Sequence, residues 1–117
     1  MKRYTVQDIH ALLPEIQAGK YTLIDIRSPE EWRQTGVMEE AVLMTYPNNP
    51  ALNSEWALDL QNHFDLETQL ILSCRSGVRS AAAIQLLEAV GFCDLINVEG
   101  GILAWLDAAY PVKTPSA

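Results

Sequence analysis

The feature that most constrains the fold of this 117-residue chain is an abrupt change of pattern between Leu70 and Gly91. Residues 70–73 form a short apolar run of strand length. A polar segment that contains Gly77 interrupts the run. Apolar residues then recur at helical spacing, namely Ile84, Leu87 and Val90. The pattern therefore predicts a strand, a tight loop and a helix in succession.

The predicted loop begins at Cys74 and leads into the first turn of the helix. Backbone amides in a first helical turn lack partners within the helix, and the helix dipole is positive there, so the position favours anions. One such anion would be the Cys74 thiolate, because the amides and the nearby Arg75 and Arg79 would lower its pKa from about 8.5. A second would be an anionic group of a substrate. The sequence therefore predicts that Cys74 is catalytic.

A structural role for Cys74 is the main alternative. Free cysteine is among the most buried residue types and usually behaves as a small hydrophobe. A cysteine in the core has no need of arginines, serines and a glycine close by, however, whereas an activated thiolate needs positive charge and close approach of the backbone. The composition of the loop therefore favours the catalytic role.

Charged residues also follow the strand expected over residues 21–27. Its apolar content suits a sheet covered on both faces, and Ser28 and Pro29 then read as a helix cap and first helical residue. Asp25 and Arg27 fall at the carboxyl end of the strand, the edge at which parallel sheets place ligand sites. Direct contact with substrate is one possibility. We favour a supporting role, in which the two side chains pair and fix the shape of the loop.

Net charge and cysteine content restrict the remaining function classes. A net charge of −7 disfavours binding to nucleic acid or to an acidic membrane surface, which require basic patches. Two cysteines without metal-ligand spacing indicate a reduced compartment, so we expect a cytoplasmic protein with no metal. We see no secretory signal and no apolar run near the length that a membrane span needs.

The length suits one domain, which we place at residues 1–110, with 111–117 as a short, frayed tail. Near the start of the chain we expect a strand over residues 3–6, followed by a helix that is capped by Thr5 or Asp8 and kinked or shifted by Pro14. A turn-rich loop over 46–50 and a helix over 54–63 follow. The last strand ends at Val98, and a final helix ends at Pro111 and buries Ile102, Trp105, Leu106 and Ala109.

Three segments together resemble the single-domain rhodanese sulfurtransferases. They run from Ile24 to Trp32, from Cys74 to Ser80 and from Val98 to Trp105, in the order of the family. The resemblance implies an α/β fold, a three-layer α/β/α sandwich with a five-stranded parallel sheet, and a six-residue active-site loop that opens on the catalytic cysteine. It also implies sulfur transfer through a persulfide of Cys74, without a cofactor.

On this resemblance, the expected site extends beyond Cys74. Arg75, Ser76, Gly77, Val78 and Arg79 would bind substrate, while Gly100 and Gly101 let the backbone turn beside the loop and support it together with Asp25 and Arg27. The expected partners are a small sulfur-containing anion as donor, such as thiosulfate, and a thiol, cyanide or protein thiol as acceptor. The protein would be a monomer or a weak dimer.

The segment 35–50 departs from the family pattern. Many members carry Gly-His-Ile-Pro-Gly-Ala here, whereas this chain keeps Gly36 and Ala41, has Val37 in place of the histidine, and lacks the second glycine and the proline. We expect this segment to be rebuilt.

Two other function classes stay open. A cysteine phosphatase or arsenate reductase would use the same thiolate, but the phosphatase loop has five residues between its cysteine and arginine, and only four separate Cys74 from Arg79. A non-catalytic rhodanese-like binding module is the other alternative, although such modules have often lost the cysteine. Cys93 has no basic neighbour and is expected to be inert, or a resolving thiol if the fold brings it close to Cys74.

Overall fold

The computed structural model describes residues 1–47 and 49–115. Its main sheet has five parallel strands, as the resemblance implied, in the order β1-β6-β5-β2-β4. The strands are β1 (Lys2–Tyr4), β6 (Leu95–Val98), β5 (Leu70–Ser73), β2 (Thr22–Asp25) and β4 (Val42–Leu43). The helices are α1 (Val6–Gln17), α2 (Pro29–Thr35), α3 (Pro50–His63), α4 (Val78–Ala89) and α5 (Gly101–Asp107).

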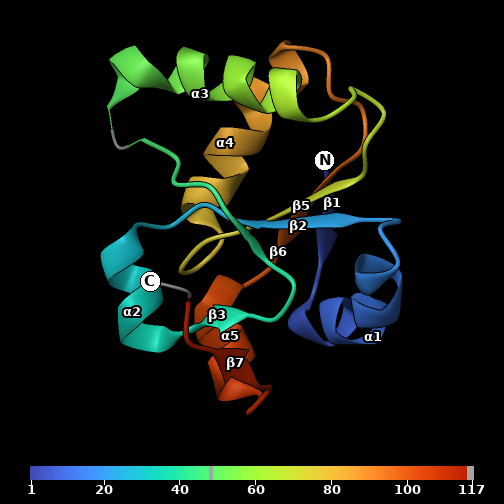
Figure 1. The fold of residues 1–117 in the computed structure, drawn as a ribbon, viewed down its shortest axis with the longest axis vertical. Helices are drawn as coiled ribbons and strands as arrows, with labels where there is room; N and C mark the ends of the chain where they lie inside the picture. The colour runs from blue at the N-terminus through green and yellow to red at the C-terminus, as the bar shows by residue number, and fades with distance from the viewer. Residues whose placement is uncertain (48, 116–117) are drawn as a thin grey trace.

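Helices cover both faces of the sheet, which confirms the three-layer α/β/α sandwich. In Figure 1, α3 and α4 lie above the sheet, and α1 and α5 lie below it. Successive side chains of β5 point to opposite faces, so Leu70 and Leu72 join a core cluster with α3 and α4, while Ile71 joins another cluster with α1 and α5. These three side chains are fully buried. A central parallel strand with both faces covered is apolar along its whole length for this reason.

The start of α1 is fixed by a reciprocal cap. The Asp8 amide donates to Thr5 Oγ1 at 3.1 Å, and the Thr5 amide donates to Asp8 Oδ2 at 2.9 Å. β1 consequently ends at Tyr4, before the position expected from the sequence. Pro14 lies inside α1 and does not shift its start, because the cap satisfies the first-turn amides upstream of the proline.

Two of the expected helix boundaries are wrong. α3 begins at Pro50 rather than at residue 54, because the Asn49 side chain accepts from the Ala51 amide at 3.0 Å and Pro50 occupies the first turn. The turn signals over residues 46–50 thus include a helix cap; Asn48 lies outside the described residues. α5 ends at Asp107, before Pro111, and both Leu106 and Ala109 are exposed rather than buried.

The expectation of a frayed tail after Pro111 is also wrong for the described part of that tail. Val112–Lys113 form β7, which pairs antiparallel with β3 (Val37–Met38). The two strands lie side by side next to α5 in Figure 1. Val37 and Met38 are fully buried, so the part of segment 35–50 that differs from the family pattern forms a small second sheet. Residues 116–117 lie outside the described residues.

Over the described ranges 1–47 and 49–115, none of the helices has both the length and the apolar character that a membrane crossing requires.

Deleting residues 112–117 is expected to destabilise the protein, because β3 loses its hydrogen-bonded partner and Val37 and Met38 lose their cover. We expect the free energy of unfolding to fall by about 2 kcal/mol, measured by urea denaturation. A control deletion of residues 114–117 keeps β7 and should leave the free energy of unfolding close to that of the full chain. Equal losses in the two deletions would contradict a stabilising role for β7.

Candidate active site around Cys74

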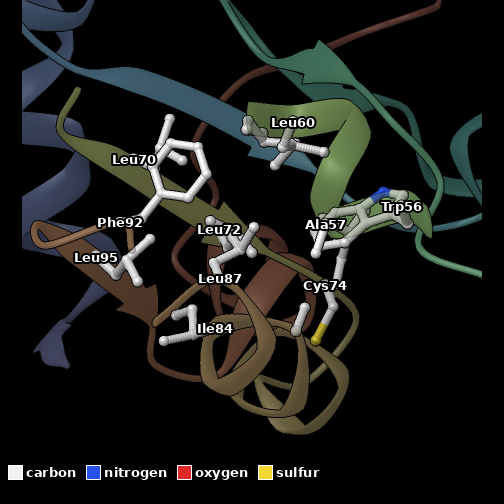
Figure 2. Packing of buried hydrophobic residues seen from close by; sticks show 13 residues of the cluster. Trp56, Ala57, Leu60, Leu70, Leu72, Cys74, Ile84, Leu87, Phe92 and Leu95 are labelled. Atoms are coloured by element: carbon white, nitrogen blue, oxygen red, sulfur yellow. The ribbon is translucent and has the colours of Figure 1, made fainter. Parts of the chain in front are cut away.

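Cys74 directly follows β5, at the edge where the parallel strands of the sheet have their carboxyl ends. Its exposed fraction is 1%. Figure 2 shows it at one end of the core cluster, with Leu70 and Phe92 at the other end. Burial alone therefore agrees with the structural role considered above. The polar groups around the sulfur distinguish the two roles.

The Cys74 sulfur accepts hydrogen bonds from its own loop. The Gly77 amide donates to Sγ at 3.1 Å, and the Ser80 hydroxyl lies 3.3 Å from it. Burial raises the pKa of the Cys74 thiol, whereas the Ser80 hydroxyl and the amides of Ser80, Gly77 and Ser76 lower it. The lowering effects together outweigh burial, so the pKa lies below its ordinary value. The site therefore favours a thiolate, which is the reactive form of cysteine.

Hydrogen bonds to the sulfur, rather than the arginines, are the largest causes that lower the Cys74 pKa. Arg75 is exposed, and both terminal nitrogens of Arg79 bind the Glu31 carboxylate, at 2.8 and 2.6 Å. The shift in Cys74 is produced by hydrogen bonds to the sulfur, against the opposing effect of burial. The pKa of Arg79 is itself raised, mainly by Glu31 and more weakly by the negative Cys74.

Glu31 is a member of this site that the sequence analysis did not identify. Its carboxylate joins α2 to the start of α4 through Arg79, and it accepts from the Ser28 amide at 3.2 Å as part of the cap of α2. The hydrogen bonds from Arg79 lower the pKa of Glu31 to about 2. No sequence signal identifies this pair, because 48 positions separate its members.

Ser80 and Asn97 extend the hydrogen-bond network away from the sulfur, and both are buried. The Ser80 hydroxyl donates to Asn97 Oδ1 at 2.5 Å, and Asn97 Nδ2 donates to the Gly77 carbonyl at 3.1 Å. Because Ser80 has one hydroxyl hydrogen, it serves Asn97 or the sulfur at one time, and a Cys74 thiol can itself donate to the Ser80 oxygen. The signal for Asn97 was available, since it is the polar residue within an otherwise apolar strand.

The loop carbonyls are held from behind by α5. The amide of Ile102 donates to the Cys74 carbonyl at 2.9 Å, and the amide of Leu103 donates to the Arg75 carbonyl at 3.2 Å. A Cβ on Gly101 would collide with the Cys74 carbonyl oxygen and lie 2.7 Å from the Arg75 carbonyl group. Gly101 therefore lies directly against the loop. Gly100 has a φ of +76° and forms the turn into α5.

Asp25 and Arg27 form a buried ion pair, 2% and 1% exposed, with Nη2 of Arg27 2.9 Å from Oδ2 of Asp25. Arg27 also donates to the Thr35 hydroxyl at 2.8 Å and to the Gly36 carbonyl at 3.1 Å. The Trp32 indole donates to Asp25 at 3.1 Å. The pair therefore anchors α2 and the residue after it. The charge of Asp25 also raises the pKa of Arg79 in the loop, and the burial of the pair leaves no surface for a substrate.

Other loop residues from the sequence analysis lie on the surface. Ser76 and Val78 are exposed, Val78 to 74%, and Gly77 adopts a φ of +99° at the start of α4.

A cavity of about 440 Å³ adjoins the loop through Arg79. It is lined by Ser28, Glu31, Thr45, Tyr46 and Arg79. A larger hollow of about 660 Å³ includes Tyr21 and Gln69, which precede β2 and β5, and so lies at the opposite edge of the sheet.

Cys93 lies away from the site. It is exposed and precedes β6, whereas Cys74 follows β5, so the two cysteines occupy opposite edges of a parallel sheet. The structure therefore does not bring Cys93 close enough to act as a resolving thiol within one molecule. Among the side chains of residues 1–47 and 49–115, no group of three or more His, Cys, Asp or Glu is placed to hold a metal ion.

Comparison with known proteins gives matches over nearly the whole chain. The family model of the rhodanese-like domain matches residues 8–108. Rhodanese-like domain-containing protein 17 of Arabidopsis thaliana is 33% identical over 98 residues, which cover 80% of this chain and 63% of that protein. The chain thus spans less than two thirds of the length of that relative.

Two further matches cover more of the partner protein. Thiosulfate sulfurtransferase 18 of Arabidopsis thaliana is 31% identical over 105 residues, which cover 85% of this chain and 76% of that protein. The crystal structure of a rhodanese-like domain protein from Staphylococcus aureus superposes with a TM-score of 0.73 at 31% identity, and the match covers 97% of this chain and 99% of that one.

Replacing Ser80 with alanine is expected to raise the pKa of Cys74, because the sulfur loses a hydrogen bond that favours its charged form. The pH at which alkylation by iodoacetamide reaches half its maximal rate should therefore move upward, measured in a Cys93→Ser background so that only one thiol reacts. Ser76→Ala is the matched control. Its side chain is exposed, its contribution is through the backbone, and the alkylation profile should not move. An unchanged profile for Ser80→Ala would show that the hydroxyl does not act on the thiolate.

Replacing Gly101 with alanine is expected to disrupt the loop, since the new Cβ meets backbone atoms of Cys74 and Arg75. We expect a loss of about 3 kcal/mol or more in the free energy of unfolding. Gly19→Ala is the control, because Gly19 also has a positive φ, +83°, but nothing within 4 Å of the new Cβ. It should lose only about 1 kcal/mol. Similar losses in both variants, by urea denaturation, would argue against close packing at Gly101.

Proposed function

Because this chain belongs to the family of rhodanese-like domains, which includes sulfurtransferases, we propose that it transfers a sulfane sulfur from thiosulfate or a related persulfide through a persulfide on Cys74. The observation that supports this most strongly is the environment of the sulfur. The Gly77 amide donates to it at 3.1 Å, the Ser80 hydroxyl lies 3.3 Å away, and these groups together with the amides of Ser76 and Ser80 lower the pKa of Cys74.

In the first step, the Cys74 thiolate attacks the outer sulfur of the donor. With thiosulfate, a bond forms between Cys74 Sγ and the outer sulfur, and the bond between the two sulfur atoms of thiosulfate breaks. The electron pair of that bond leaves with sulfite, and the outer sulfur keeps its negative charge as the terminal atom of the new persulfide. The loop amides that stabilise the thiolate also suit this anion.

In the second step, an acceptor thiolate or cyanide attacks the terminal sulfur. The bond within the persulfide breaks, and its electron pair returns to Cys74 Sγ as the thiolate. The products are an acceptor persulfide or thiocyanate, so neither step requires an external oxidant or reductant. The resting enzyme is regenerated for another cycle.

The proposed chemistry needs no separate general base, because the nucleophile is already ionised when its pKa is lowered. The two histidines lie elsewhere in the fold. The ring of His10 stacks on Tyr110, with centroids 4.1 Å apart, and His63 binds the carbonyl of Asp59 within α3. Neither histidine lines the cavity at Arg79.

The loop supports this proposal over a phosphatase or arsenate reductase. Arg79, the residue that would hold a phosphate in that chemistry, is engaged through both terminal nitrogens by Glu31. A purely structural module has no need of a buried thiol whose pKa is lowered, so the environment of Cys74 also supports catalysis over binding alone.

Incubating the protein with thiosulfate, removing excess donor and measuring the intact mass tests the proposal. We expect a gain of one sulfur atom, because the persulfide is covalent, and loss of that gain in Cys74→Ser. Cys93→Ser is the matched control and should keep it, since Cys93 lies at the other edge of the sheet. A sulfur that stays in Cys74→Ser, or that disappears in Cys93→Ser, would contradict the assignment.

A further inference from the structure

We propose that Glu31 determines donor specificity at this site, and that the site prefers an alkyl persulfide carrying at most one negative charge over thiosulfate. The proposal rests on the sulfur transfer proposed above and narrows its donor. It follows from three features of the described residues: the pairing of the cations around Cys74, the permanence of the Glu31 charge, and the neutral character of the remaining cavity wall.

Two of the three arginines considered for this site are already paired. Arg27 is buried against Asp25 at 2.9 Å, and Arg79 is bound by both oxygens of Glu31 at 2.8 and 2.6 Å. Arg75 is exposed, and none of the ion pairs formed among the described residues includes it. Thiosulfate would bring two negative charges next to a thiolate that is itself negative. The site thus offers one solvated arginine against the combined charge of nucleophile and donor.

Glu31 keeps its charge throughout the range in which a thiolate operates. Arg79 holds the pKa of Glu31 at about 2, and Ser28 donates to Oε1 through its amide and its hydroxyl, both at 3.2 Å. The Glu31 side chain is only 25% exposed. The carboxylate is therefore fixed at the cavity wall, where it neutralises Arg79 and repels a second anion.

The rest of the cavity wall suits an uncharged group. Ser28, Thr45 and Tyr46 contribute hydroxyls, and burial raises the pKa of Tyr46, so that its phenol stays neutral. A volume of about 440 Å³ leaves room for an organic substituent beside Arg79, the loop cation whose pKa the negative Cys74 raises. An alkyl persulfide fits this description. Its outer sulfur bonds to Cys74 Sγ, the bond between its two sulfurs breaks, and the electron pair leaves with the alkyl thiolate.

The test compares kcat/KM for thiosulfate with kcat/KM for N-acetylcysteamine persulfide, which is uncharged outside its persulfide group. In the unmodified protein we expect the persulfide to be used at least about tenfold better. In Glu31→Gln, kcat/KM for thiosulfate divided by kcat/KM for the persulfide should rise about tenfold, because the amide no longer neutralises Arg79. Glutamine keeps the oxygen that accepts from the Ser28 amide, so the cap of α2 is preserved.

Glu30→Gln is the matched control. Glu30 precedes Glu31 in the first turn of α2 and loses the same charge on substitution, but it is exposed and does not appear among the partners of Arg79. Its donor ratio should stay that of the unmodified protein. A second readout is the dependence of kcat/KM on ionic strength. Raising the ionic strength should lower kcat/KM for thiosulfate in Glu31→Gln and not in the unmodified protein, because the substitution turns repulsion of thiosulfate into attraction.

The outcomes separate the two proposals. If neither donor leaves a sulfur on Cys74, the proposed function is wrong. If both donors load Cys74 but the unmodified protein uses thiosulfate as readily as the persulfide, or if Glu31→Gln and Glu30→Gln change the ratio equally, the role of Glu31 is wrong. Should Glu31→Gln fail to fold, the proposal is tested by the unmodified protein alone. Use of thiosulfate as readily as the persulfide, or a kcat/KM for thiosulfate that falls as ionic strength rises, would then overturn it.

Discussion

The site depends on the hydrogen bonds between α5 and the carbonyls of Cys74 and Arg75. The amide of Leu103 binds the Arg75 carbonyl and so holds the peptide group between Arg75 and Ser76, and the Ser76 amide is among the groups that lower the pKa of Cys74. The contact requires the backbone of Gly101 to touch the loop, which excludes any side chain there. A neutral arrangement of peptide dipoles can then stabilise an anion that is almost fully buried.

Peptide dipoles matter more here than full charges. Asp25 neutralises the buried Arg27, and Glu31 neutralises the half-buried Arg79. These pairs anchor α2 beside the loop. The thiolate therefore owes its stability to Ser80 and to loop amides, and the paired charges fix the geometry in which those groups act.

The five-stranded parallel sheet followed from the resemblance to the rhodanese family, whereas the residue pattern itself predicted a strand over 21–27 covered on both faces and the place of Cys74 between a strand and a helix. These last two depend on periodicity or on residues adjacent in the chain. Glu31 could not be predicted as the partner of Arg79, since the two meet only through packing of α2 against α4. The same limitation hid the pairing of Arg79, which the sequence presented only as a cation beside Cys74. Asn97 is different, because a polar residue in a buried strand is visible in the sequence and indicates a hydrogen-bonded partner.

The separation of the two cysteines at opposite edges of the sheet has a consequence for oxidative damage. A peroxide that converts Cys74 to a sulfenic acid leaves that group without an internal thiol to capture it as a disulfide. Recovery then depends on a small thiol or a reductase able to reach a residue that is 1% exposed. The topology that isolates the nucleophile thus also makes its repair depend on other molecules.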